Sequence, residues 1–266
     1  MAMPLGCGEA PPPLEPAGGG GGYAGTTSTT STGQMTNDAT LLGVVMDAQG
    51  QPLADAFLGL CANACWASAS ASDGRFAYEK IPPGDYHLDV RIDGTPGGAD
   101  VQPTTGTISV AMALTVHQTL ELPPLFVPDP GAATRLVGGP QRVEVSGLSL
   151  TADPAEWSLP VGVEGPYLSA VRVPEAQWPP NPVEGGEVLA RWALNPYGTA
   201  SDQPMPLTVD NDLGLAAKAE VGVFTLDPSN GKLERETTGT VSADGSLIEA
   251  PAGITRVTWI VLAQPR

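Results

Sequence analysis

Residues 41–90 read LLGVVMDAQGQPLADAFLGLCANACWASASASDGRFAYEKIPPGDYHLDV, and the fold is predicted mainly from this segment. Short apolar runs alternate in it with turn residues at three places. Asp47–Gly50 predicts a turn that Pro52 stiffens, and Asp73-Gly74 predicts a hairpin. Pro82–Gly84 ends a strand and reverses the chain. The spacing of these turn residues therefore predicts successive short strands of a small antiparallel β-sandwich.

The alternation of side chains along this stretch predicts which of them form the core. Phe76 and Tyr78 are two residues apart, as are Tyr86, Leu88 and Val90. Residues spaced by two lie on the same face of a strand. We therefore expect these aromatic and aliphatic side chains to point into the sandwich.

The order of strands and turns in residues 41–90 resembles the carboxypeptidase regulatory-like domain, a prealbumin-like sandwich. The resemblance implies a fold and hints at an extracytoplasmic compartment, but it names no ligand. Metallocarboxypeptidases carry their zinc-binding His and Glu residues in a separate catalytic domain. Nothing in this chain resembles that domain.

The composition narrows the class of protein. Among 266 residues there are 33 glycines and 28 prolines, which suits short strands joined by tight turns. The 29 acidic and 12 basic residues give a formal charge of −17. Such a surface repels nucleic acid, so no nucleic-acid partner is predicted. No segment approaches the ~20 apolar residues of a membrane-spanning helix.

The predicted fold class is all-β, with two antiparallel β-sandwich domains after a disordered N-terminal linker. Residues 1–38 are rich in Pro, Gly, Ser and Thr and predict a flexible tether. Residues 39–128 form the regulatory-like sandwich and residues 129–266 the second sandwich. Pro123-Pro124 and the prolines of residues 128–131 predict a hinge between them.

Eight strands are predicted in the second domain from alternating or continuous apolar runs. Residues 192–196, 207–211 and 221–223 loosely resemble ZU5-like β-sandwich modules of surface proteins. The predicted strands are Gln141–Val145, Tyr167–Val173, Glu187–Leu194, Met205–Val209, Glu220–Asp227, Leu233–Val241, Leu247–Ala250 and Arg256–Ala263.

Two cysteines flank a loop of three residues, Cys61 before it and Cys65 after it. A hairpin with that loop would place the two side chains opposite each other, at about the ~4 Å Cβ separation that a disulfide needs. We expect a local disulfide, the alternative being two separate half-buried thiols. A metal site is disfavoured because no second Cys or His pair lies nearby in the sequence.

The third cysteine, Cys7, stands in the sequence Leu5-Gly6-Cys7-Gly8, which resembles the end of a bacterial lipobox. The resemblance implies lipidation of Cys7 and tethering of the protein to a membrane by that lipid. No basic and apolar leader precedes Cys7, and the alternatives are a misplaced start codon, a trimmed chain or an accidental resemblance.

An enzyme is not predicted, because the residues for catalysis do not occur together. The two histidines are His87, whose alternation with Tyr86 and Leu88 predicts a solvent-facing ring, and His117 at a strand end. Neither has neighbours arranged as a triad, and no Gly-x-Ser-x-Gly sequence occurs.

No cofactor is predicted, and calcium is the one metal with a candidate site. Asp210 and Asp212 flank Asn211, and such oxygen-rich loops bind Ca²⁺. The alternative is that these residues, like Asp47, Asp73 and Asp244, only form turns by bonding their own backbone. The turn interpretation is favoured, since no EF-hand pattern follows.

Among the tryptophans, Trp192 and Trp259 are predicted to be core residues, whereas Trp178 in its proline-rich loop is predicted to be exposed and available for binding. The sequence thus predicts a secreted or surface-tethered bacterial protein with a structural or protein-interaction role. The alternative is a carbohydrate-binding module, because the prealbumin-like fold is shared with starch-binding domains. The predicted partner is accordingly a protein or a glycan at the cell surface.

Overall fold

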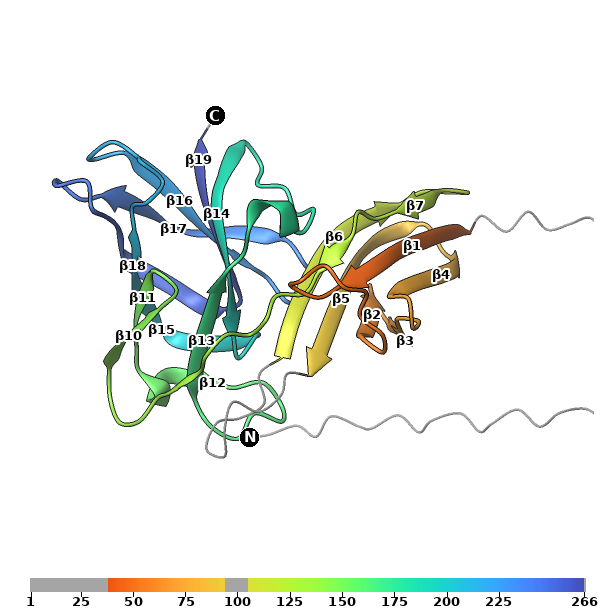
Figure 1. The fold of residues 1–266 in the computed structure, drawn as a ribbon, viewed down its shortest axis with the longest axis horizontal. Helices are drawn as coiled ribbons and strands as arrows, with labels where there is room; N and C mark the ends of the chain where they lie inside the picture. Colours follow the sequence, from red (N-terminus) through yellow and green to blue (C-terminus); the bar gives the residue numbers. More distant parts are fainter. Residues whose placement is uncertain (1–37, 94–104, 266) are drawn as a thin grey trace, which may run out of the picture. The chain divides into compact units, whose positions relative to one another are not determined.

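The computed structural model describes residues 38–93 and 105–265, which lie in one compact unit, Thr36–Arg266. Within these ranges the chain forms nineteen strands and two short 3-10 helices, and it contains no α-helix (Figure 1). The all-β prediction is confirmed. Cys7 and its surroundings lie outside the described residues.

Two four-stranded sheets are built from the first eight strands. One sheet has the order β4-β1-β7, with β8 also pairing with β1, and the other has the order β3-β2-β5-β6. The bounds are β1 Ala39–Met46, β2 Phe57–Cys61, β3 Cys65–Ala69, β4 Arg75–Ile81, β5 Gly84–Asp93, β6 Thr105–Leu114, β7 Thr119–Glu121 and β8 Leu125–Phe126.

The core between these two sheets contains the side chains that alternation predicted. Phe76 and Tyr78 of β4 are buried, as are Tyr86, Leu88 and Val90 of β5. They belong to one hydrophobic cluster that also holds buried leucines of β1 and β2. The prediction of a small sandwich with this core is therefore confirmed.

The predicted hinge begins too early in the sequence. Directly after Pro123-Pro124, β8 pairs in parallel with Val45 and Met46 of β1, and its Leu125 is fully buried. A proline can precede a short edge strand because no ladder hydrogen bond is required of its nitrogen. This part of the proline-rich segment thus belongs to the first sandwich.

The remaining strands form one eleven-stranded sheet of order β10-β11-β15-β18-β17-β16-β19-β14-β13-β9, with β12 on β15. Their bounds, with the two 3-10 helices η1 and η2, are β9 Thr134–Arg135, β10 Gln141–Val145, β11 Leu148–Ala152, η1 Pro154–Glu156, β12 Trp157–Ser158, β13 Tyr167–Arg172, η2 Glu175–Gln177, β14 Gly186–Asn195, β15 Thr199–Asp210, β16 Glu220–Leu226, β17 Leu233–Val241, β18 Leu247–Val257 and β19 Trp259–Pro265.

This sheet curls so that its two ends approach each other. The Ser146 hydroxyl, just after β10, donates to the Ala170 carbonyl of β13 at 2.9 Å. The Trp192 indole of β14 donates to the Ser146 carbonyl at 3.0 Å. The curled sheet encloses a second hydrophobic cluster, in which Trp192 is 1% exposed. All eight predicted strands are present, while β9, β11 and β12 were not predicted.

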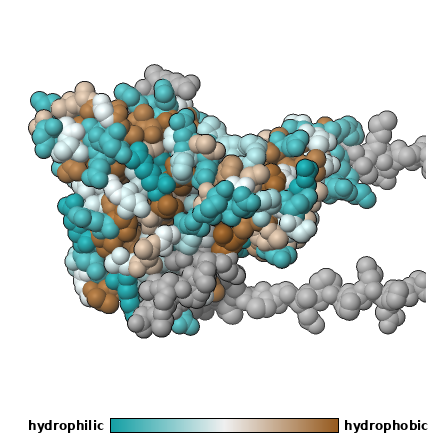
Figure 2. Space-filling model, viewed as in Figure 1, coloured by the Kyte–Doolittle hydropathy of each residue, from teal (hydrophilic) through white to brown (hydrophobic). Residues whose placement is uncertain are grey.

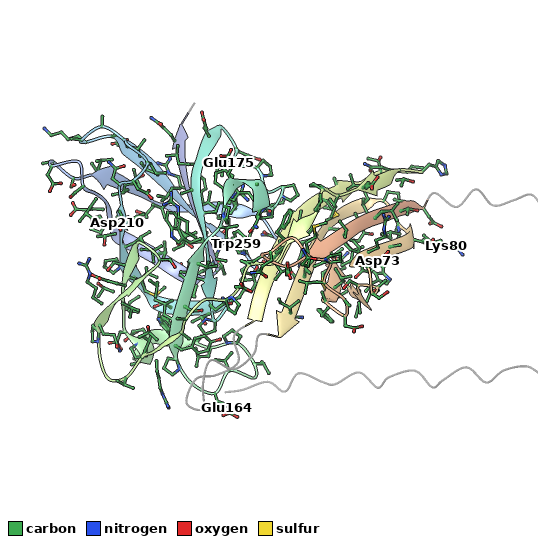
Figure 3. All side chains as sticks on the ribbon, viewed as in Figure 1. Asp73, Lys80, Glu164, Glu175, Asp210 and Trp259 are labelled. Carbon is green, nitrogen blue, oxygen red and sulfur yellow. A yellow bond between two sulfur atoms is a disulfide. The ribbon has the colours of Figure 1, made fainter. Side chains whose placement is uncertain are left out.

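The two sheet systems are joined by packing as well as by hydrogen bonds. Trp259, which is 2% exposed, belongs to the hydrophobic cluster of the first sandwich, and its indole donates to the Thr107 carbonyl of β6 at 2.9 Å (Figure 3). The Gln177 amide donates to the Ala48 carbonyl at 2.8 Å. The core predictions for Trp192 and Trp259 are confirmed. The exact limits of two domains stay a prediction, because the described residues form one compact unit.

Candidate functional site

The β2–β3 hairpin ends in the predicted disulfide. Cys61 and Cys65 are cross-strand partners in the register and are joined by a bond between their sulfur atoms. The loop is closed by the Ala62 amide, which donates to the Ala64 carbonyl at 3.0 Å. The covalent link and the short loop hold the hairpin tip in place.

The disulfide lies on the outer face of the β3-β2-β5-β6 sheet, the face turned away from the sandwich core. In the register, Cys61 is opposite His87 and Gly59 is opposite Asp89. Because Tyr86, Leu88 and Val90 point into the core, the residues between them point outward. Alternation thus gathers Cys61, His87 and Asp89 on one outer surface.

The turn between β16 and β17 covers part of this surface. Gly231 sits so close that a Cβ added there would lie 2.9 Å from the His87 Cβ and 3.0 Å from the Ser109 hydroxyl. Its φ of +68° is also one that glycine adopts without strain. The Asp227 carboxylate accepts from the Ser229 amide, and the Asn230 side chain accepts from the Lys232 amide. These hydrogen bonds hold residues 227–232 in a tight turn.

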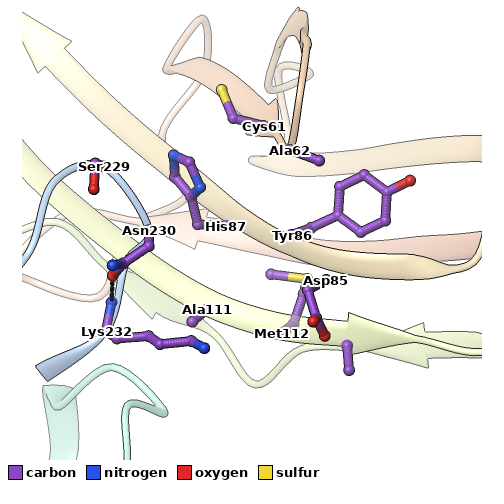
Figure 4. Close-up of a pocket in the computed structure, with 11 residues that line it drawn as sticks. Cys61, Ala62, Asp85, Tyr86, His87, Ala111, Met112, Ser229, Asn230 and Lys232 are labelled. Atoms are coloured by element: carbon purple, nitrogen blue, oxygen red, sulfur yellow. Dashed lines mark hydrogen bonds between the residues drawn. The ribbon is translucent and has the colours of Figure 1, made fainter.

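Between these elements lies a cleft with a volume of about 390 Å³. Such a volume is within the range of small-molecule sites in proteins. Its walls carry opposite charges, since Asp85 and Lys232 both line it (Figure 4). The lining residues come from the hairpin tip (Cys61 and Ala62), β5 (Asp85, Tyr86 and His87), β6 (Ala111, Met112 and Ala113) and the β16–β17 turn (Ser229, Asn230 and Lys232).

The sequence prediction for His87 is wrong. Its ring does alternate away from the sandwich core, but its side chain is only 12% exposed. The prediction assumed that a side chain pointing away from the sandwich core would be exposed to solvent. The β16–β17 turn, which is remote in the sequence, covers that position.

The charges around His87 are partly buried. The Nε2 atom of His87 lies 3.8 Å from the Oδ2 atom of Asp89. Burial raises the pKa of the Asp89 carboxyl, and the Ser109 hydroxyl, followed by the charges of His87 and Arg91, only partly opposes that shift. Asp89 also presents a buried Oδ1 atom with no hydrogen-bond partner among the described residues.

Cys61, His87 and Asp89 are also the one group of potential metal ligands found in the described part of the chain. One ligand atom from each lies within 4.8 Å of the others. The sulfur of Cys61 is bonded to Cys65, however, so it is not a thiolate. The spacing of the cysteines alone does not predict this group, because His87 and Asp89 lie on a different strand from Cys61. The signal was the pair His87 and Asp89, two apart on a strand.

The same surface does not present a Ser-His-Asp arrangement. In the register, Ser109 is opposite Asp89, while His87 is opposite Ala111. A nucleophilic serine needs the histidine as its neighbour. Ser109 is moreover 1% exposed, which leaves no room for a substrate to reach it.

Trp178 is not the exposed residue that its proline-rich loop predicted. It is half-buried against the first hydrophobic cluster, and its indole donates to the Val173 carbonyl at 2.9 Å. The guanidinium of buried Arg191 lies over the ring, 5.3 Å from its centre. This cation–π contact covers one face of the indole ring, and ligand binding at Trp178 stays a prediction.

The exposed tryptophan is Trp66 on β3, which the sequence analysis did not single out. Its side chain is 43% exposed, and its ring lies 5.8 Å from that of Tyr86. The exposure of Trp66 could have been predicted from residues 67–72, which follow it. They are all alanine or serine, and their side chains are too small to cover an indole.

Asp212 and Asn211 of the predicted calcium loop are engaged in other contacts. Asp212 forms an ion pair with Arg172, and the Asn211 amide donates to the carbonyls of Leu215 and Gly245. Asp210 is exposed (Figure 3). These contacts are those of a structured loop; calcium binding at Asp210 and Asp212 stays a prediction.

The turn roles predicted for three aspartates are confirmed. Asp47 accepts from the amides of Gln49 and Gln51, and Asp73 accepts from the amide of Arg75. Asp244 accepts from the Ser246 amide and from the hydroxyls of Ser242 and Ser246. These hydrogen bonds close the exposed loops locally.

No family model matches the chain, and no characterised protein sequence matches it either. Among solved structures, a candidate carbohydrate-binding protein from Pseudomonas aeruginosa is 13% identical, with 37% of this chain and 92% of that chain covered and a TM-score of 0.27. A candidate carbohydrate-binding protein from Bacteroides uniformis is 9% identical, with 86% and 79% covered and a TM-score of 0.24. The major pilin subunit of Bacillus cereus is 10% identical, with 86% and 59% covered and a TM-score of 0.20. Since these TM-scores are below 0.5, function has to be argued from the residues of this chain.

Over residues 38–93 and 105–265, no helix has the length and apolar character needed to cross a bilayer.

Proposed function

We propose that the chain is a non-catalytic extracytoplasmic binding module that holds a small polar ligand, of carbohydrate type, in the cleft beside the Cys61–Cys65 disulfide. The observation that carries this proposal is the cleft itself. Its volume of about 390 Å³ has room for a sugar unit, and its walls offer both hydrogen-bond donors and acceptors. A sugar hydroxyl can use both.

The walls of the cleft are held by rigid elements, which favours binding. One wall is the covalently closed tip of the β2–β3 hairpin, and the opposite wall is the hydrogen-bonded β16–β17 turn. The floor is open because Ala111 and Ala113 carry small side chains on β6. Asp85 and Lys232 are exposed and free to reorient toward a ligand.

Three observations support the proposed class, a non-catalytic extracytoplasmic binding module. The resemblance of residues 41–90 to the carboxypeptidase regulatory-like domain supports a prealbumin-like module, a fold shared with starch-binding domains. The disulfide supports an oxidising, extracytoplasmic setting. The lack of a triad around His87 supports binding without catalysis.

A glycan array followed by calorimetry tests the proposal, with Ala113→Trp as the variant that fills the cleft. We expect wild type to bind a glycan and Ala113→Trp to lose at least tenfold in affinity. Ala77→Trp is the matched control, because Ala77 is an exposed strand residue outside the cleft. The absence of any glycan ligand, or an equal loss in both variants, would count against the cleft.

A protein partner is the second candidate function, and β3 favours it. This strand lies at the edge of its sheet, and all five of its residues are exposed. Residues 56–72 contain no charged side chain, although charge is the usual protection of an exposed edge. A partner could therefore add a strand to β3.

The edge proposal is tested by crosslinking on the host cell surface. The Ser70 amide donates to Ala56, so alternation directs the Ala67 amide outward. We expect Ala67→Pro to lose a crosslinked partner that Ala67→Ser retains. Identical crosslinks for the two variants would exclude pairing at β3.

Surface tethering through Cys7 is a separate proposal, supported by the lipobox-like sequence around it. Intact mass of the protein from its own host tests it. A mature chain beginning at Cys7 with an added diacylglycerol is the expected form. An unmodified Cys7 would exclude the anchor.

A further inference from the structure

We propose that the Cys61–Cys65 disulfide closes a divalent metal site, and that reduction of this disulfide opens the site for a zinc-type ion bound by Cys61, His87 and Asp89. The proposal goes beyond ligand binding in the cleft. It assigns a second state to the same surface.

The three ligand types meet on adjacent strands. Cys61 at the end of β2 is opposite His87 of β5, and Asp89 follows two residues later on the same face. One ligand atom from each lies within 4.8 Å of the other two, and the Nε2 and Oδ2 atoms are 3.8 Å apart. Ligands about 2.0–2.3 Å from a tetrahedral zinc ion are roughly 3.3–3.8 Å from one another. Small side-chain rotations therefore bring these atoms to coordination distance.

The surroundings of these atoms also suit a cation. Cys61 is 8% exposed, and the Oδ1 atom of Asp89 is buried without a hydrogen-bond partner among the described residues. A buried carboxylate oxygen that lacks a donor is costly, and a metal ion on this carboxylate offsets that cost. The imidazole of His87, whose Nε2 atom lies 3.8 Å from the Asp89 carboxylate, is a common zinc ligand.

The disulfide determines whether the site exists. A cysteine binds a metal as the thiolate, and a disulfide sulfur has no such charge. Reduction by a dithiol transfers two electrons and two protons to the Cys61–Cys65 bond, giving two thiols and the oxidised dithiol. The Cys61 thiol then releases its proton to solvent as the metal binds. The fourth position on the ion is left for water.

Two single substitutions separate this site from a free thiol in general. Cys65→Ser and Cys61→Ser both remove the disulfide and both leave one cysteine of the hairpin. Only Cys65→Ser leaves that cysteine in the ligand group, because Cys61 and not Cys65 lies with His87 and Asp89. The pair is therefore matched in everything but the position of the sulfur.

The measurement is titration with Co²⁺ followed by displacement with Zn²⁺, on the full chain carrying Cys7→Ser in every variant. We expect Cys65→Ser to bind one Co²⁺ with the charge-transfer absorption of a thiolate–cobalt bond, and Cys61→Ser to bind at least tenfold more weakly without that absorption. In the Cys65→Ser background, His87→Gln should lose at least tenfold in affinity. Oxidised wild type should show no thiolate–cobalt absorption, and wild type reduced by a phosphine should gain it.

Several outcomes would overturn the proposal. Equal Co²⁺ affinities for the two cysteine variants would show a nonspecific thiol, and a folded Cys65→Ser that binds no Co²⁺ would exclude the site. Circular dichroism of each variant and of reduced wild type shows whether the sheet persists. Should loss of the disulfide unfold the chain, reduction cannot open a metal site and the proposal is wrong.

Discussion

The two sheets of the first sandwich differ in what covers their outer faces. On β4, buried Phe76 and Tyr78 alternate with exposed Ala77 and Glu79, so that sheet has one buried and one solvated face. On β6, Ile108 and Val110 are buried on one face, and Thr107 and Ser109 are just as buried on the other. Alternation alone would predict that these polar side chains are exposed to solvent. Their burial shows instead that this face of the sheet is covered by another part of the molecule.

The solvent-exposed surface differs from this covered polar face. On the face drawn in Figure 2, hydrophilic and hydrophobic residues are interspersed over the described part of the chain. The covered polar face of β5 and β6 is instead held by specific hydrogen bonds. The Asn181 side chain donates to the carbonyls of Ser109 and Gly231 at 3.0 and 2.8 Å. It thereby joins β6 to the β16–β17 turn.

The largest loss of stability is expected from removing the large side chain that covers the outer face of β6. Trp259→Ala deletes an indole that is 2% exposed and its hydrogen bond to Thr107. We expect a loss of about 3–5 kcal/mol in the free energy of unfolding, measured in urea. Trp66→Ala, at the 43% exposed position, is the control and should cost no more than about 1 kcal/mol. Similar losses for the two would show that Trp259 does not hold the sheets together.

Arg191 offers the next largest effect, because it holds the segment that carries Asn181. Its guanidinium donates to the carbonyls of Pro179 and Asn181 at 2.8 and 2.6 Å, and burial lowers its pKa to about 10. Arg191→Met keeps most of the bulk but leaves both buried carbonyls without a donor. We expect a loss of roughly 2–4 kcal/mol in urea unfolding.

The matched control for Arg191 is Arg142→Met, at an exposed arginine of β10. It should change the free energy of unfolding by no more than about 0.5 kcal/mol. A loss for Arg191→Met that is no larger than this would mean that water replaces the guanidinium and that the loop is not held by it.

Much of this fold follows from local sequence, and the site does not. The turns at Asp47, Asp73 and Asn230 bond their own backbone, so a few neighbouring residues suffice to predict them. The disulfide follows from the same local spacing.

The cleft and the ligand group depend instead on pairings between distant residues. His87 is opposite Cys61, and Gly231 covers it from another sheet. Trp178 was predicted to be exposed because its loop is rich in proline, but Arg191 on β14 covers it. Composition around a residue cannot show which distant strand will pack on it.

Gly231→Ala tests how closely the β16–β17 turn packs on the outer face of β5 and β6. Gly231→Ala meets the His87 Cβ at 2.9 Å as well as the Ala111 amide nitrogen at 3.1 Å, and its φ is +68°. Gly245→Ala is the control, because its φ of +78° is similar but its added Cβ would meet nothing within 4 Å. We expect about 1 kcal/mol for the control and roughly 1–3 kcal/mol more for Gly231→Ala in thermal or urea unfolding. Equal costs would show that only backbone strain acts at Gly231.

The smallest expected effect on stability is at the exposed turn that contains Asp244. Hydrogen bonds from Ser242 and Ser246 lower the pKa of Asp244 to about 2, from an ordinary value of 3.8. Because the folded pKa is the lower one, the charged form favours folding. This contribution is complete above pH 3.8 and is lost as the pH falls toward 2. Asp244→Asn should therefore lower the midpoint of thermal unfolding slightly at pH 5, and the difference from wild type should shrink as the pH approaches 2. A difference that stays constant from pH 5 to pH 2 would assign the effect to turn geometry and not to the charge.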